Sequence, residues 1–290
     1  MEKKFAGTFF IAIVFAFMLV ALNCVGTMIL PRAGEAFAAE TETQEKTYAA
    51  SGIMPLGGTI TNTYTETVSY SRVETEEYKN PYSLPPYIAE NVSDGCAVTA
   101  GGAVIGHFDR LYDELIPNHS GISLGGKYIY RPQNAQVDAM FLELAAAMGT
   151  GTGMGTSVSG YISGMQSYVS GKGRTASISS VYNGALNESA YKSALESGKL
   201  VTIFVDGFEL TNLIVSGGTA TMTNTRATGA HTLTAYGYAV YRFFDAAGSL
   251  VREEKFLHVN SGFSEYDLLT TVRLTGGFCT VDDGYSINIY

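Results

Sequence analysis

The chain has 290 residues, of which 46% are hydrophobic and 16% are charged, and it carries a formal net charge of −9. This composition is that of a globular protein, and the chain is long enough for one large domain or two lobes. The acidic balance argues against nucleic acids and anionic surfaces as partners. With only 3 cysteines, the fold has to rest on a hydrophobic core rather than on a disulfide framework.

The N-terminal segment 1–38 has the features of an export signal. Lys3 and Lys4 precede a nearly uninterrupted apolar stretch, which ends at the small-residue pattern "EAFAAE". We therefore expect a secreted protein whose residues 1–38 are a signal peptide. Because the apolar stretch is also long enough to cross a bilayer, an uncleaved membrane anchor is the alternative. A lipoprotein signal at Cys24 is disfavoured, since the preceding residues "ALN" do not end in small residues.

The segment 39–84 is predicted to be a linker or a pro-segment. It is rich in Thr, Glu, Ser and Tyr and offers little to bury, although "TYTETVSYSRVETEEY" alternates partly and is compatible with a strand. The prolines of "NPYSLPPY" then mark the entry into the main domain. We place the boundary near residue 85 and assign residues 85–290 to one domain.

Four helices are predicted in the first half of this domain. The first begins at Cys96, with Ser93 or Asp94 as its cap, and its small residues "AGGA" would let other elements approach closely. Apolar residues at helical spacing predict the others in "RPQNAQVDAMFLELAAAMG", "TSVSGYISGMQSYVSG" and "NESAYKSALESG". The glycine-rich "GTGTGMGTSVSG" lacks the spacing of the phosphate-binding motifs, so we expect a link there and no nucleotide site.

After residue 199 the period of the hydrophobic pattern changes from about 3.6 residues to about 2, which predicts strands. "KLVTIFVDG" is one strand, and a hairpin follows in "ELTNLIVSGGTATMTNT". A second hairpin joins "HTLTAYGYAVYRFF" to "LVREEKFLHVN", and "LLTTVRL" and "YSINIY" are the last strands. Helices followed by strands indicate an α+β fold, with a helical lobe packed against an antiparallel sheet or barrel.

Cys96 is the candidate nucleophile. A thiol reacts as the thiolate, and the unpaired N–H groups and the dipole of a helix N-terminus lower its pKa. The alternatives are a small apolar core residue and a disulfide with Cys279. A catalytic cysteine also needs a base, and a third group that holds this base in one tautomer.

His231 is the histidine best placed to act as the base. His107 lies about 16 Å along the helix from the thiol, because each residue adds about 1.5 Å, and this leaves it a capping or packing role. His258 shares a strand face with Asn260 and is a poor second choice. His231 opens a long strand 135 residues after Cys96, and Asn260 ends the partner strand 29 residues later.

Cysteine, histidine and asparagine in this order and at these separations resemble the papain-like cysteine peptidases. The chain is similar in particular to exported bacterial members such as the streptopain-like and double-glycine leader peptidase-like proteins. "DGCAVTAGGAVIGHFDRLY" resembles their nucleophile helix, "GAHTLTAYGY" their histidine strand, and "LHVNSGF" the segment with the orienting Asn or Asp. The likeness covers about residues 85–275.

This resemblance implies that Cys96 is the nucleophile, that His231 is the general base and then the acid, and that Asn260 bonds the imidazole. The backbone N–H of Cys96 would supply one oxyanion donor. The second donor in the family is usually a Gln shortly before the cysteine. Here no Gln lies between Lys46 and Cys96, and the nearest amides are Asn91 and Asn80, of which Asn91 is closer to the cysteine in sequence. The resemblance implies neither a cofactor nor a metal.

The chain departs from the family in two further places. Papain-like enzymes often place Trp after the orienting asparagine, whereas this chain has no Trp and has Phe263 nearby, where it would shield the histidine–asparagine bond. A hairpin near residues 208–225 looks like an insertion before the histidine strand and would border the cleft.

We therefore expect an exported cysteine peptidase that hydrolyses a protein or peptide substrate through an acyl-enzyme intermediate on Cys96. One alternative is a peptidoglycan amide hydrolase or acyl transferase with the same Cys–His pair. Another is a binding module that keeps the papain-like shell without turnover, which the missing Gln motivates. The N-terminal segment would supply any association with the cell wall or membrane.

Overall fold

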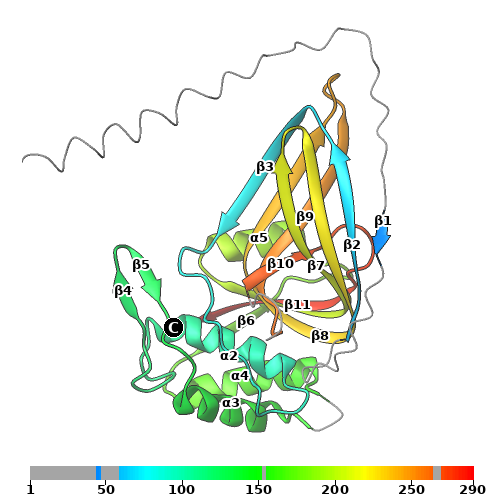
Figure 1. Cartoon of the computed structure of the whole chain (residues 1–290). Helices are drawn as coiled ribbons and strands as arrows, with labels where there is room; N and C mark the ends of the chain where they lie inside the picture. Colours follow the sequence, from blue (N-terminus) through cyan, green and yellow to red (C-terminus); the bar gives the residue numbers. More distant parts are fainter. Residues whose placement is uncertain (1–43, 47–58, 152–154, 264–268) are drawn as a thin grey trace, which may run out of the picture. The chain divides into compact units, whose positions relative to one another are not determined.

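Figure 1 shows the computed structural model of the chain, which describes residues 44–46, 59–151, 155–263 and 269–290. The predicted signal segment 1–38 lies outside these residues. The helices are α2 (Cys96–Asp109), α3 (Ala135–Met148), α4 (Val158–Gly171) and α5 (Glu188–Glu196). The strands are β1 (Gln44–Lys46), β2 (Thr59–Ser69), β3 (Arg72–Lys79), β4 (Ile122–Leu124), β5 (Lys127–Ile129), β6 (Ala176–Ser180), β7 (Leu200–Ser216), β8 (Thr219–Phe244), β9 (Leu250–Asn260), β10 (Leu269–Arg273) and β11 (Val281–Ile289). None of the helices in the described ranges is long and apolar enough to span a membrane.

One 9-stranded antiparallel sheet dominates the fold, in the order β1-β2-β8-β9-β10-β7-β11-β6, with β3 added alongside β8. The long strand β8 is its centre. The first part of β8 pairs with β2 and β7, and the second part pairs with β3 and β9. Since β10 pairs with both β9 and β7, the pairings of β7, β8, β9 and β10 close into a ring. The fold is therefore α+β, with helices packed on an antiparallel sheet.

Helices cover both faces of this sheet. The helices α2, α3 and α4 share a hydrophobic core with Phe204 of β7 and Tyr236 of β8. The helix α5 shares a second core with Leu233 and Val240 of β8. Because successive side chains of a strand point to opposite faces, Thr232, Thr234 and Tyr236 of β8 lie on the side of α2. Leu233 and Ala235 lie in the core shared with α5.

The strands β7 and β8 are longer than the sequence pattern indicated. The hairpin near residues 208–225 continues both strands past a bulge between Asp206 and Phe208, instead of forming a separate unit. Gly207 lies at this bulge with a φ of +82°, which L side chains rarely adopt. His231 consequently lies in the interior of β8 and does not open a strand.

The segment 59–79 falls within the predicted linker or pro-segment, yet it forms two strands of the sheet. Ile60, Tyr64 and Val68 of β2 are buried. The strand β3 pairs with β8 along its whole length. The folded unit therefore starts well before residue 85.

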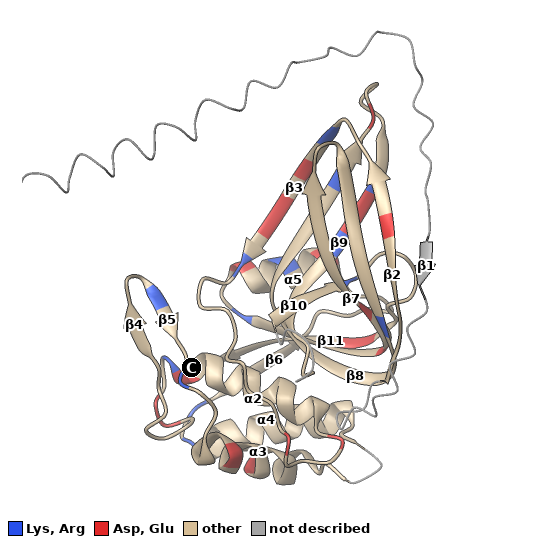
Figure 2. Cartoon of the chain, in the orientation of Figure 1, with Lys and Arg blue, Asp and Glu red and all other residues tan. Residues whose placement is uncertain are grey.

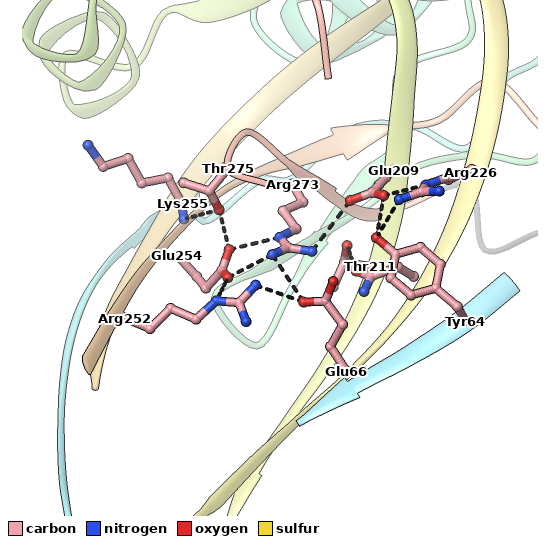
Figure 3. A network of polar contacts seen from close by, with 11 residues as sticks. Tyr64, Glu66, Glu209, Thr211, Arg226, Arg252, Glu254, Lys255, Arg273 and Thr275 are labelled. Carbon is pink, nitrogen blue, oxygen red and sulfur yellow. Dashed lines mark hydrogen bonds and ion pairs between the residues drawn. The ribbon is translucent and has the colours of Figure 1, made fainter. Parts of the chain in front are cut away.

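A buried network of charges ties β2 to the ring of strands (Figure 3). Arg273 and Glu254 are each 1% exposed, and the guanidinium group donates to both carboxylate oxygens at 2.8 Å. Arg273 also lies 3.3 Å from Glu66 of β2 and 3.5 Å from Glu209 of β7. A buried guanidinium group needs such partners, because removing an isolated charge from water costs several kcal/mol. The network also includes Tyr64, Arg226, Arg252 and Thr275.

The helix α2 lies at the centre of the packing, and every residue from Ala97 to Asp109 is buried. Asp109, its last residue, is the one acidic residue along its length. Its glycines permit close contacts: a Cβ atom at Gly102 would lie 2.2 Å from Cε1 of Phe141 in α3. On the sheet side, the hydroxyl of Thr234 donates to the carbonyl of Ala100 at 3.0 Å. Small residues therefore let α3 and β8 approach the helix from two sides.

We expect Gly102→Ala to lower the free energy of unfolding by about 1–3 kcal/mol, because the added methyl group would overpack against Phe141. The matched control is Gly171→Ala at the end of α4, where an added Cβ has no heavy atom within 4 Å. Urea denaturation followed by circular dichroism measures both changes. Equal stability of the two variants would contradict the close packing of α2.

We also expect a fragment of residues 85–290 to fail to fold, since it lacks β2 and β3 and leaves Arg273 without Glu66. A fragment of residues 59–290 keeps both strands and is expected to unfold cooperatively. Thermal melts of the two fragments, followed by near-UV circular dichroism, make the comparison. A cooperative melt of the shorter fragment at the same temperature would show that β2 and β3 are dispensable.

Candidate active site

Cys96 is the first residue of α2, and its sulfur faces the sheet. The Sγ atom lies 3.9 Å from the hydroxyl oxygen of Thr232 in β8. Cys96 and Cys279 are both free thiols, so the disulfide considered from the sequence is not formed. Gly95 occupies the N-cap position in place of the expected Ser93 or Asp94, and no side chain caps the helix. The first N–H groups of α2 are therefore available around the sulfur.

The environment of Cys96 keeps the thiol protonated at neutral pH. Burial raises the pKa of Cys96, while the Thr232 hydroxyl and backbone N–H groups at Ala97 and Thr232 act in the opposite direction. The helix N-terminus thus lowers the pKa as the sequence argument assumed, but the loss of solvation is the larger effect. A base has to remove the proton before this sulfur becomes a nucleophile.

His231 directly precedes Thr232 in β8, and its ring orientation is fixed on several sides. The Nε2 atom lies 2.8 Å from the carbonyl oxygen of Ser261. A carbonyl oxygen only accepts hydrogen bonds, so Nε2 carries a proton. The rings of Phe208 and Phe263 stack on the imidazole, with centroid distances of 5.2 Å and 4.7 Å. Phe263 therefore covers the histidine itself.

Asn260 ends β9 and shapes the turn that follows. Its Oδ1 atom accepts a hydrogen bond from the Gly262 N–H at 2.9 Å, and its Nδ2 atom donates to the carbonyl of Pro85 at 3.3 Å. Its register partner on β8 is Thr234, three residues beyond His231. The hydrogen bond from Nε2 of the imidazole is accepted by the backbone carbonyl of the next residue, Ser261. The resemblance had assigned this role to the Asn260 side chain.

Gly262 brings this turn between His231 and the nucleophile helix. An added Cβ atom at Gly262 would lie 3.6 Å from Nε2 of His231 and also 3.6 Å from Cγ2 of Thr99, one turn along α2 from Cys96. Its φ of +73° is a further reason for glycine at this position. Cys96, His231 and the turn after Asn260 therefore converge at the N-terminal end of α2, although Thr232 is the residue that contacts the sulfur.

Two amides bear on the question of the second oxyanion donor. Asn91 is exposed in the turn before α2, and no hydrogen bond of its side chain is described. The side chain of Gln133 accepts a hydrogen bond from the N–H of Ile88 and donates one to the carbonyl of Ile88, both at 2.9 Å. It is therefore not available as an oxyanion donor. Asn91 thus stays the nearer candidate.

The other two histidines weighed from the sequence have partners of their own. The Nδ1 atom of His107 lies 2.8 Å from the carbonyl oxygen of Ser83, and burial lowers the pKa of His107 to about 4. The Nε2 atom of His258 lies 3.1 Å from a carboxylate oxygen of Glu77. Burial lowers the pKa of His258 to about 4 as well. His107 has the packing role that its distance from Cys96 predicted.

The structure adds groups that sequence reasoning missed. Thr232 contacts the sulfur, Phe208 stacks on the imidazole, and the Ser261 carbonyl orients the ring. A backbone carbonyl leaves no trace in the sequence, because every residue has one. The sequence shows that Thr232 is next to the candidate base His231. Because side chains alternate along a strand, however, only one of the two is expected to face the helix.

Comparisons of the chain with models of protein families, with curated proteins and with solved structures found no significant match. Within the described residues, no group of three or more His, Cys, Asp or Glu side chains is arranged to hold a metal ion. The chemistry of the site therefore has to be judged from its own geometry.

We expect alkylation of Cys96 by iodoacetamide, in a Cys279→Ser background, to accelerate up to alkaline pH because burial raises the thiol pKa.

Thr232→Val is expected to slow the alkylation of Cys96 at pH 7 by roughly two- to tenfold, since it removes a hydrogen bond to the thiolate worth about 0.5–1.5 kcal/mol. Mass spectrometry follows the labelling. Thr225→Val, the same change elsewhere on β8, is the control. Equal rates in both variants would contradict the role of Thr232.

Proposed function

We propose that the chain is an exported papain-like cysteine peptidase in which Cys96 attacks the substrate carbonyl and His231 transfers the proton. The observation that carries this proposal is the convergence at the start of α2. Cys96 opens the buried central helix, and its sulfur lies against the strand residue next to a histidine whose Nε2 is fixed by Ser261. A central helix packed on an antiparallel sheet supports the papain-like assignment. The export part of the proposal is supported by the signal-like sequence of residues 1–38.

The reaction starts with proton transfer from the thiol to Nδ1 of His231, which leaves a thiolate and an imidazolium. The Ser261 carbonyl keeps its bond to Nε2 throughout and favours the cationic ring. The thiolate attacks the peptide carbonyl, and the backbone N–H of Cys96 donates to the oxyanion, with Asn91 as the second donor. The imidazolium returns its proton to the leaving amine. Water, deprotonated by the same imidazole, then hydrolyses the thioester.

Proton transfer requires Nδ1 to come within hydrogen-bond distance of the sulfur, which now contacts Thr232. Catalytic hydrogen bonds are often long in ligand-free enzymes and shorten when substrate binds. His231 and Thr232 are neighbours on β8, so we propose that a rotation of the Cys96 side chain brings the sulfur from the Thr232 hydroxyl toward the imidazole. The described arrangement is then the resting state, before the proton leaves the thiol.

A non-catalytic binding module is the second candidate, and the same contact favours it. A thiol whose pKa is raised by burial and whose sulfur contacts a threonine hydroxyl is inert unless the site rearranges. Such a module would keep the helix and sheet arrangement without turnover. The two candidates differ in whether Cys96 is needed for peptide hydrolysis.

We expect Cys96→Ala to reduce hydrolysis of casein by at least about a thousandfold, because the proposed acyl intermediate forms on the Cys96 sulfur. The control is Cys279→Ala, which is expected to keep full activity. Release of dye-labelled peptides from casein measures turnover, and near-UV circular dichroism verifies that both variants are folded.

Unchanged turnover in folded Cys96→Ala would overturn the peptidase proposal. If the parent protein does not cleave casein but releases soluble fragments from purified cell wall, the substrate of the same site is peptidoglycan. Inactivity of the parent on both substrates would leave the binding module as the function.

A further inference from the structure

A pocket of about 400 Å³ lies on the sheet, outside the proposed active site, and is lined by β3, β7, β8, β9 and β10. Phe256 and His258 of β9 contribute to its wall. They share a strand face with Asn260, because residues two apart on a strand point the same way. None of Cys96, His231 or Asn260 lines this pocket, which we call the sheet pocket. Its volume is within the range of small-molecule sites, roughly 300–1,000 Å³.

The charged groups of the sheet pocket neutralise one another. Glu77 and Lys79 of β3 form an ion pair at 2.7 Å, and the ribbon in Figure 2 is coloured for both basic and acidic residues along this strand. His258 lies 3.1 Å from the same carboxylate and is neutral at pH 7, since burial lowers its pKa to about 4. A charged ligand would therefore find no unpaired opposite charge on this wall.

His258 contacts Glu77 at the sheet pocket, but with poor hydrogen-bond geometry. The side chain is 6% exposed, and its Nε2 atom is buried without a hydrogen bond of good geometry, despite its short distance to Glu77. Buried polar atoms of this kind nearly always have a partner in the functional state. A ligand hydroxyl group, which both donates and accepts, fits such an atom in either tautomer.

The rest of the lining combines hydroxyl groups with apolar side chains. Thr211, Thr271 and Tyr241 line the sheet pocket. The Thr211 hydroxyl donates to the Oδ1 atom of the fully buried Asn224 at 2.7 Å, so its lone pairs are left to accept from a ligand. The ring of Tyr241 packs edge-on against Phe256, at a centroid distance of 6.0 Å. The pocket therefore combines neutral polar groups with aromatic surface.

We propose that the sheet pocket binds a neutral polyhydroxylated ligand with the size of one or two sugar rings. Ring hydroxyls match the mixture of donors and acceptors at Glu77, His258 and the threonines, and the C–H faces of the ring match Tyr241 and Phe256. The balanced charge of the wall excludes a strongly anionic or cationic ligand. This binding site does not depend on catalysis at Cys96.

Isothermal titration calorimetry of the purified protein with glucose, N-acetylglucosamine, cellobiose and chitobiose tests the proposal. We expect at least one neutral sugar to bind, and glucuronate and glucosamine to bind at least about tenfold more weakly. Glu77→Gln is expected to weaken the binding by about tenfold, as loss of a charged hydrogen-bond acceptor costs about 1.5 kcal/mol. Glu74→Gln, an exposed residue of the same strand outside the pocket, is the matched control.

The proposal is overturned if none of the neutral sugars binds, if the charged analogues bind more tightly, or if Glu77→Gln binds like the parent. Cosedimentation with insoluble chitin or purified cell wall distinguishes a polymeric glycan from a free saccharide as the source of the ligand. Cys96→Ala is expected to bind sugar as the parent does, so the outcome is separate from that of the peptidase proposal.

Discussion

Burial of α2 between α3 and β8 is the constraint on which the rest of the described structure depends. A helix whose residues after the first are all buried can pack on several sides only if its side chains are small, and Gly102 and its small neighbours meet this requirement. The packing leaves little freedom for the start of the helix. Cys96 is consequently held against β8, and its sulfur meets the strand at Thr232.

The same packing explains why the histidine is positioned through the backbone. β8 has to present Thr232 and Thr234 to α2, which points His231 toward the aromatic rings of Phe208 and Phe263. The turn after Asn260 then closes over the ring, and its Ser261 carbonyl fixes Nε2. A single turn thus joins the strand, the imidazole and the nucleophile helix.

Long strands and buried charges stabilise the sheet that presents these groups. β8 has four partners along its 26 residues, so a displacement of β8 is resisted by all of them. Arg273 links three strands through Glu66, Glu209 and Glu254. Because a buried charge without partners is costly, this network makes the early segment 59–79 part of the folded unit.

The sequence by itself determined the helices, most of the strands, the α+β class and the position of Cys96 at a helix start, because these follow from local periodicity and from the turn-forming residues between the elements. Only the tertiary structure decided which faces meet. Alternation along β8 cannot tell whether His231 or Thr232 faces α2, since both faces of this strand are buried. Pairing of distant strands likewise decided that residues 59–79 belong to the sheet and that a backbone carbonyl at Ser261 orients the imidazole. Such contacts depend on backbone groups and on partners far apart in the chain, and neither leaves a local pattern in the sequence.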